Sequence, residues 1–194
     1  MSAGSYELLR ALVSPVVAIT TRRGEELNGL IVNSALRASL SPEKLRLSII
    51  VHKFNHSHDM IFESGVFTAH ILRADQMDLV IRLGTASGRD GDKLGGMPYR
   101  LGATGAPIFD DCYAFFECRV VNAMDTGGST FFLGAVESAG GDGSGEVMTS
   151  KHVRTGVPIE NQEQYEEDLA RGQRFATEMA DRMRALVWRD LPRE

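Results

Sequence analysis

The densest group of anion-binding side chains lies in residues 52–58, which read HKFNHSH. This segment combines a lysine ammonium, imidazoles, an amide and a hydroxyl, and it follows an apolar run at 45–51. A short helical pattern, Asp59 to Glu63, comes directly after it. The first turn of a helix has N–H groups without intrahelical partners and carries the positive end of the helix dipole. The segment is therefore suited to bind a small anion.

A second polar loop, residues 33–39 (NSALRAS), follows another apolar run, Leu27 to Val32. Its small side chains leave the backbone N–H groups open to a ligand. The stretch from Asn28 to Ile61 thus contains two strand-like runs, and each ends in a loop rich in hydrogen-bond donors. If the chain binds a ligand, we expect the ligand to lie against these two loops.

Motifs for several other kinds of chemistry are missing or poorly spaced. The sequence contains no G-x-S-x-G elbow and no G-x-x-x-x-G-K-[ST] loop, and the glycines at 84–105 do not match G-x-G-x-x-G between a strand and a helix. His52, His56 and His58 crowd one loop, but no carboxylate or further histidine stands at a recognised ligand interval. We therefore expect neither a serine hydrolase, a common nucleotide fold nor a metal site.

Length and composition indicate a globular protein of one domain, or one domain with an appendage. The 194 residues carry a formal net charge of -5, and 43% are hydrophobic. An acidic balance argues against nonspecific binding to nucleic acid or to anionic membranes. No apolar run approaches the roughly 18 residues that a membrane helix needs, and no signal-peptide pattern opens the sequence. We therefore expect a cytoplasmic protein.

The two cysteines, Cys112 and Cys118, fall in one predicted strand. At about 3.3 Å per residue their Cα atoms would lie roughly 20 Å apart. A disulfide needs a separation of about 4.4 to 6.8 Å. The sequence predicts two reduced thiols.

Short strands dominate the predicted elements. Alternating or β-branched runs predict strands at 16–20, 27–32, 45–51, 66–72, 112–121, 130–137 and 146–149. Helices are predicted at Tyr6 to Leu12, capped by Ser5, and from a cap at Asp75 to Leu83. About seven short strands with few helices favour a barrel over a doubly wound sheet.

Residues 85–107 are rich in glycine and lack apolar periodicity, which predicts a long surface loop. Loops of this length are commonly functional or mobile. Arg89, Asp90, Asp92 and Lys93 form a mixed-charge cluster within it. The cluster could be a solvated turn or a lid that faces a ligand, and the sequence leaves both interpretations open.

The last part of the chain predicts one long helix, from about Asn161 to Trp188. Alternating steps of four and three residues form a stripe of small and apolar side chains on one face. The stripe consists of Tyr165, Leu169, Gly172, Ala176, Met179, Met183 and Leu186. It could pack on the chain's own barrel or across a dimer, and the pattern favours neither alternative.

Several motifs in order resemble the flavin reductase-like family of FMN-binding split β-barrels. They are N-G-L-I-V-N-S, S-L-S-P, H-K-x-x-x-S-H-D-M-I and E-S-G-V-F-T-A-H-I-L, followed by S-G-R-D-G-D-K-L and A-F-F-E-C-R-V. The resemblance covers roughly residues 8 to 140. It implies a mostly β, Greek-key split barrel at residues 1–155. A helical extension at 156–194 would pack on the barrel or across a dimer.

The resemblance also implies a homodimer that holds FMN, with FAD as an alternative, and that takes hydride from NADH or NADPH. Residues that would contact the isoalloxazine and its side chain are Asn33, Ser34, Ala35 and Ser39. Residues that would hold the phosphate are Lys53, Asn55, Ser57 and His58. Arg89 and Lys93 are further candidates for contact with flavin or nicotinamide. A partner monooxygenase or electron-transfer protein would then use the reduced flavin.

The sequence departs from the family pattern in two places. Many members have threonine where Ile31 stands, and many have a glycine-acid-histidine-threonine turn where this chain has Gly127 to Thr130. The resemblance associates that histidine with the nicotinamide side of the site. A flavoprotein that carries electrons without efficient NAD(P)H turnover is therefore the alternative, and a barrel for another planar ligand such as haem is a more distant one.

Overall fold

The structure, a computed structural model, describes residues 8, 9 and 11–184. Leu8 and Leu9 are helical, whereas Ser5 and Tyr6, the predicted start of the first helix, lie outside the described residues. The same holds for Leu186 and Trp188, the predicted end of the last helix.

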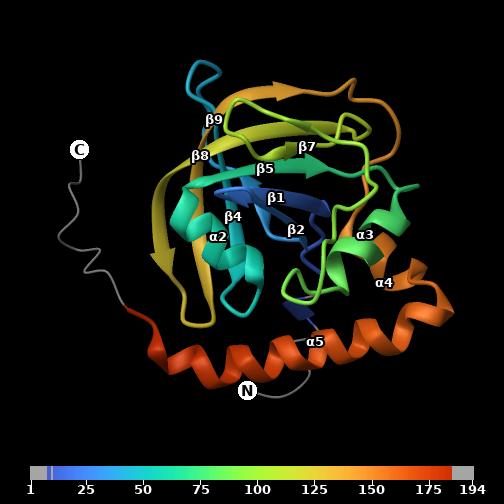
Figure 1. The fold of residues 1–194 in the computed structure, drawn as a ribbon. Coiled ribbons are helices and arrows are strands. Elements are labelled where there is room, and N and C mark those ends of the chain that lie inside the picture. The colour runs from blue at the N-terminus through green and yellow to red at the C-terminus, as the bar shows by residue number, and fades with distance from the viewer. Residues whose placement is uncertain (1–7, 10, 185–194) are drawn as a thin grey trace.

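A seven-stranded antiparallel sheet in the order β2-β1-β5-β8-β9-β4-β3 forms the barrel (Figure 1). Its strands are β1 (Val17–Arg23), β2 (Glu26–Val32), β3 (Ala35–Arg37), β4 (Arg46–His52), β5 (Val66–Ile71), β8 (Ala114–Asp125) and β9 (Ser129–Gly140). β5, β8 and β9 form a meander, and β4 lies beside β9, which is the Greek-key order. The expected mostly β, Greek-key barrel is confirmed.

The sheet curves around an apolar core to which strands from both of its ends contribute. Ile19, Phe67 and Phe132 are among the fully enclosed side chains, and Ile49 and Val51 of β4 join them from the opposite edge. Ala18 of β1 and Val16 just before it instead pack in a second apolar cluster with residues of the helix α3 (Met77–Gly84). Both faces of the chain are thus buried at the start of β1, which explains why residues 16–19 are all apolar.

The helix α2 (His56–Ser64) begins three residues before the predicted start at Asp59. Its first turn therefore contains His56 and Ser57, and Gly65 ends it in the left-handed conformation at φ 67°. This earlier start places Ser57 at the helix N-terminus instead of in the preceding loop.

The cap predicted for the next helix was wrong. The N-cap of α3 is Gln76, not Asp75. The Gln76 side chain accepts a hydrogen bond from the Arg73 N–H at 2.9 Å and donates to the Asp111 carbonyl at 2.7 Å. Asp75 instead forms an ion pair with Arg73 at 3.3 Å. The bond from Gln76 to Asp111, 35 residues further along the chain, could not be foreseen from the local sequence.

The segment 146–149 was predicted as a strand, and the structure shows only isolated bridges there. Its residues pass between two other segments and form one bridge to each, Thr149 with Pro15 and Val147 with Arg73. The predicted loop at 85–107 also differs, because β6 (Arg100–Leu101) pairs with β7 (Pro107–Ile108) near its end.

The strand predicted at 112–121 begins two residues later and continues further, since β8 spans Ala114–Asp125. Cys112 lies in the bend before it, where its thiol donates to the Phe109 carbonyl at 3.2 Å. Both cysteines are free and buried, as predicted. Burial raises the pKa of Cys112 to about 11 and that of Cys118 to about 12, so both are protonated at neutral pH.

Two helices follow the last strand, where a single helix was predicted from about Asn161 to Trp188. α4 (Ser150–Gly156), capped by Thr149, was not expected, and α5 spans Ile159–Met179 before a 3-10 turn at Ala180–Arg182. The boundary expected at 155/156 falls in the last turn of α4, and the division into two parts stays a prediction.

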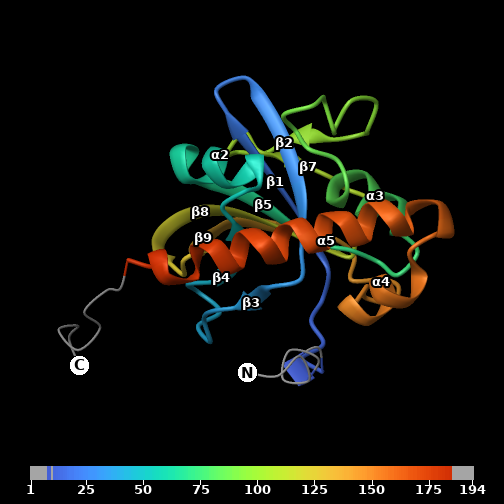
Figure 2. The same ribbon diagram turned by 90° about the horizontal axis from the view of Figure 1, so that it is seen from below.

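α5 crosses one end of the barrel (Figures 1 and 2). None of its side chains is buried. Gly172 lies against the ring of Phe54, and Ala176 lies against Gly128 in the turn between β8 and β9. These positions of the predicted stripe thus pack on the chain's own barrel.

Candidate functional site

A cavity of about 410 Å³ lies between the start of α2, the strand β2, the loop after α3 and the helix α5. Its walls include Asn28, His52, Phe54, Asn55, His56, Ser57, Gly88, Arg89, Lys93, Tyr165, Asp168, Leu169 and Arg171. The donor-rich loop and the glycine-rich loop, which are far apart in sequence, therefore meet at one site.

Two polar side chains at the start of α2 face this cavity without a hydrogen bond to any described residue. Ser57 is only 1% exposed, yet its hydroxyl has no hydrogen-bond partner among the described side chains and backbone groups. Asn55 is the N-cap of α2, but its side chain makes no capping bond. Both groups can therefore bind a ligand at a helix N-terminus, where negative charge is favoured.

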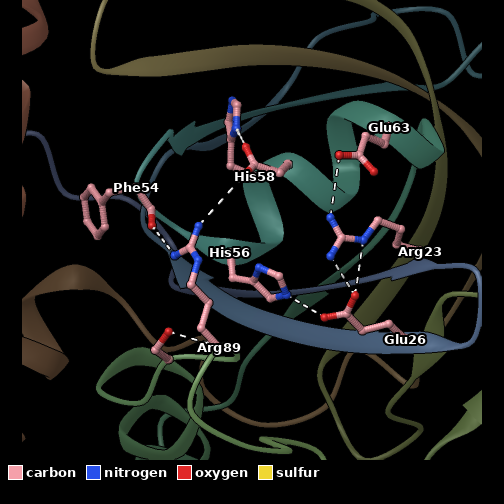
Figure 3. A network of polar contacts seen from close by, with 9 residues as sticks. Arg23, Glu26, Phe54, His56, His58, Glu63 and Arg89 are labelled. Atoms are coloured by element: carbon pink, nitrogen blue, oxygen red, sulfur yellow. Dashed lines mark hydrogen bonds and ion pairs between the residues drawn. The ribbon is translucent and has the colours of Figure 1, made fainter.

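Arg89 brings a cation to the same place from the long loop (Figure 3). Its Nη1 donates to the Phe54 carbonyl at 2.9 Å, and its Nη2 lies 3.7 Å from Asp59. These contacts hold the guanidinium beside the first turn of α2. The structure places Arg89 and Lys93 in the wall of the cavity, although Arg89 is exposed like Asp90 and Asp92. That the cluster faces a ligand stays a prediction.

Lys93 is a buried cation in the cavity wall. Its Nζ donates to the Leu83 carbonyl at 2.6 Å. Burial lowers the pKa of Lys93 to about 8, and the nearby Asp168 carboxylate acts in the opposite direction. A further negative charge near this buried ammonium would stabilise its charged form.

Asn33 lines a second cavity, of about 480 Å³, on the other side of a shared wall. The residues common to both cavities are Ile31, Gly84, Tyr165 and Leu169. Three other residues assigned to the ring line neither cavity. Ser34 donates to the Ile50 carbonyl at 3.0 Å, Ala35 is buried in the core, and Ser39 bonds to Ser41 at 3.1 Å.

Two residues assigned to the phosphate point elsewhere. Lys53 Nζ lies 2.7 Å from Asp125 in the β8–β9 hairpin. His58 is turned into the barrel, where Nε2 lies 2.8 Å from the Thr130 hydroxyl and Nδ1 lies 2.9 Å from Asp59. The early start of α2 causes this, because His58 becomes an inward-facing residue of its first turn. Neither Lys53 nor His58 lines the cavity.

His52 and His56 also line the cavity, although the residues expected to hold the phosphate did not include them. His52 Nδ1 lies 2.7 Å from the Ser129 hydroxyl, and its ring stacks on Phe54. Burial lowers the pKa of His52. His56 Nε2 pairs with Glu26 at 2.5 Å, as Figure 3 shows. Across residues 8, 9 and 11–184, no group of three or more His, Cys, Asp or Glu side chains is arranged to hold a metal.

The helix α5 supplies the outer wall of the site. Asp168 and Arg171 form an ion pair at 2.7 Å, and Arg171 also lies over the ring of Phe54 at 6.0 Å. Nothing in the sequence pattern marked these two residues, because they lie beside the stripe that predicted the packing face.

The family model for the flavin reductase like domain matches residues 9–156. The chain belongs to this family. The matched range contains both donor loops, the long loop and every strand of the barrel.

The relatives that the chain matches are named for different functions. The high molecular weight rubredoxin of Moorella thermoacetica is 30% identical over 143 residues, which is 73% of this chain and 62% of that protein. The chain therefore spans less than two thirds of that relative.

Solved structures of similar proteins share the fold. The NADH:FAD oxidoreductase of Streptomyces globisporus C-1027 superposes with a TM-score of 0.70 and 25% identity, over 79% of this chain and 93% of that one. The FMN-binding protein of Thermus thermophilus gives 0.61 and 26%, over 67% and 73%. The split-barrel fold is thus established. No helix in the described part of the chain is long and apolar enough to cross a membrane.

Proposed function

We propose that the protein binds FMN across the two adjoining cavities and transfers hydride from NAD(P)H to it. The observation that carries the proposal is the convergence of Asn55, Ser57 and Arg89 on one cavity at the N-terminus of α2. The phosphate would lie at this end. The ring would extend past the shared wall toward Asn33 in the second cavity.

The donor set fits a phosphate dianion. Such a group takes hydrogen bonds from a cation, from hydroxyl or amide donors and from a helix start. Arg89 supplies the guanidinium, Ser57 and Asn55 supply donors without protein partners, and α2 supplies its first-turn N–H groups. Lys93 adds a second cation in the wall.

The wall between the cavities fits a flat ring. Ile31, Leu169 and Tyr165 give it apolar surface, and Gly84 leaves room beside Ile31. Backbone groups of the loop at Asn33 can bind the polar edge of the ring. These residues bind and orient the flavin and exclude water from one side of it.

Bound flavin would accept hydride from the nicotinamide, which is chemistry that the cofactor itself supplies. The protein's task is to position the two rings. His52 and His56 provide polar side chains at the cavity edge where a second substrate can approach. The test uses both NADH and NADPH.

Anaerobic stopped-flow absorbance tests the proposal. The protein loaded with FMN is mixed with NADH and, in parallel, with NADPH. We expect the flavin absorbance to bleach with at least one of them, at a rate that rises with the concentration of the nicotinamide. Persistence of the oxidised spectrum with both would overturn the proposed reaction.

A second function is an electron carrier that holds FMN and receives electrons from a protein. Ser129, which stands where many family members have histidine, and the likeness to a rubredoxin of M. thermoacetica favour it. Efficient steady-state oxidation of NAD(P)H with free flavin as acceptor would exclude this alternative.

We also propose a homodimer that passes reduced flavin, or its electrons, to a monooxygenase or another partner. Leu36 and Leu40 are exposed in and after β3, at the sheet edge, where a second copy could cover them. Light scattering would show a mass of twice the 21.2 kDa chain. A monomer at micromolar concentration would contradict the dimer. A cytoplasmic location stays a prediction.

A further inference from the structure

Asn28, on β2, is a largely buried residue in the wall of the cavity. The residue is only 3% exposed and lines the cavity at α2. Its backbone pairs with Thr21 in the sheet, but its carboxamide has no hydrogen bond to any residue that the structure describes. The carboxamide is not sealed off, because among the described residues only the Thr68 hydroxyl is a fully enclosed side-chain N or O atom without a partner. The Asn28 carboxamide is therefore open to the cavity and can bind a polar group there.

The long loop lies directly against this carboxamide at Gly88. A Cβ added at Gly88 would lie 2.3 Å from Asn28 Nδ2 and 2.6 Å from its Cγ. Only a residue without a side chain allows this approach. The backbone of Gly88 thus covers one side of the amide, and its other side faces the cavity.

The position of Asn28 lies between the two ends of the proposed flavin site. On one side, Gly88 is followed by Arg89, which belongs to the phosphate end. On the other side, β2 continues to Ile31, which belongs to the wall shared with the ring cavity. In FMN, the group between phosphate and ring is the ribityl chain with its hydroxyls.

We propose that Asn28 holds the ribityl hydroxyls of the flavin. A carboxamide offers both donors and an acceptor, and each hydroxyl of a ribityl chain can use both. The inference rests on the proposed function and adds to it a positioning residue that fixes the ring relative to the phosphate. It also explains why the loop carries glycine at position 88.

Three flavins of increasing size test the inference by fluorescence titration. Lumiflavin has the ring alone, riboflavin adds the ribityl chain, and FMN adds the phosphate. In Asn28→Leu, which keeps the volume and removes the polar group, we expect binding of riboflavin and FMN to weaken about tenfold, the value of one lost hydrogen bond. Lumiflavin binding should be unchanged. Equal loss for all three, or no loss for any, would overturn the inference.

Stability and a matched variant separate a ligand contact from a structural role. The melting temperature of ligand-free Asn28→Leu should equal or exceed that of the wild type, because the buried amide has no protein partner to lose. A lower melting temperature with unchanged flavin affinity would make Asn28 merely structural. Ser57→Ala is the matched control, and it should weaken FMN but not riboflavin.

Gly88→Ala provides an independent variant, since its methyl group would displace the carboxamide. We expect it to lose the same affinity for riboflavin as Asn28→Leu, and the double variant to lose no more than either alone. Additive losses would contradict the contact. If the wild type binds none of the three flavins, the proposed function fails as a whole; if it binds them and Asn28→Leu does too, only this inference fails.

Discussion

Nδ1 of His52 lies 2.7 Å from the hydroxyl of Ser129, and the two residues face each other in the pairing of β4 with β9. Ser129 stands where the family resemblance leads one to expect a histidine. The pairing of the two strands thus places the His52 imidazole beside Ser129, the residue that stands at the position of the expected histidine. His52, unlike Ser129, also lines the cavity, so an imidazole is still present at this edge of the site.

We expect His52→Ala to lower the second-order rate constant for flavin reduction by NAD(P)H about tenfold, the effect of one lost hydrogen bond to the substrate. Ser129→Ala should have a smaller effect, since it only frees the imidazole to rotate. Anaerobic stopped-flow measures both, with FMN affinity as the control. Unchanged rates in His52→Ala would show that the imidazole does not contact the second substrate.

Arg89 and Lys53 should differ sharply in their contribution to FMN binding. Arg89 lines the cavity, whereas Lys53 is paired with Asp125 outside it. A hydrogen bond to a charged group contributes about 1.5 to 3 kcal/mol, so Arg89→Met should weaken FMN binding by roughly ten- to a hundredfold. Lys53→Met should change it less than twofold. A larger loss of FMN affinity in Lys53→Met than in Arg89→Met would indicate that the phosphate binds on the other side of α2.

FMN affinity should fall as the pH rises through 8. Burial lowers the pKa of Lys93 to about 8, so the free protein loses this ammonium above that pH, while the phosphate remains a dianion. A bound dianion holds the proton on Lys93, and the affinity at pH 9 should be about tenfold below that at pH 7. Lys93→Met should bind FMN more weakly at pH 7 and show no such dependence. Equal slopes in both proteins would rule out Lys93 as the cause.

The barrel should lose stability in mild acid because of His70. This imidazole is fully buried, with Nδ1 hydrogen-bonded to the Ala18 carbonyl at 3.1 Å and Nε2 accepting from the Phe109 N–H at 3.1 Å. Burial lowers its pKa to about 4, and the bond to Ala18 opposes this. In the unfolded chain His70 therefore binds a proton below about pH 6.5, whereas in the folded chain it stays neutral until about pH 4.

Stability present above pH 6.5 is thus lost as the pH falls toward 4, by up to about 3 kcal/mol. Urea unfolding at several pH values measures it. His70→Gln should be less stable at neutral pH but should lose less of its stability on acidification. An identical acid loss in the variant would assign the effect to other groups.

The barrel could be predicted because the pattern of apolar and polar residues along its strands matches the pattern of buried and exposed side chains. β4 alternates, and Ile49 and Val51 point inward as expected, while residues 16–19 are apolar on both faces because α3 covers the outer side. The last helices were harder. α4 is short and its place depends on contacts with distant segments, and α5 ends at Met179 although the apolar stripe continues to Met183.

The site was predictable where its residues adjoin one helix start. Asn55 and Ser57 follow β4 directly, so their meeting at the N-terminus of α2 could be read from the sequence. The roles of other residues depend on pairing in three dimensions. The proposed role of Asn28 depends on the close approach of Gly88 to its side chain. Lys53 points away from the site because it pairs with Asp125.

The most direct test is an equilibrium titration of FMN into the wild type and Ser57→Asp, followed by flavin fluorescence. Ser57 is buried in the first turn of α2, where aspartate is compatible with the helix, so the fold should persist. A carboxylate there would lie against the phosphate in a poorly solvated site, and we expect FMN binding to weaken by several kcal/mol while riboflavin binding changes little. Equal FMN affinity in the two proteins would contradict a flavin phosphate at the start of α2.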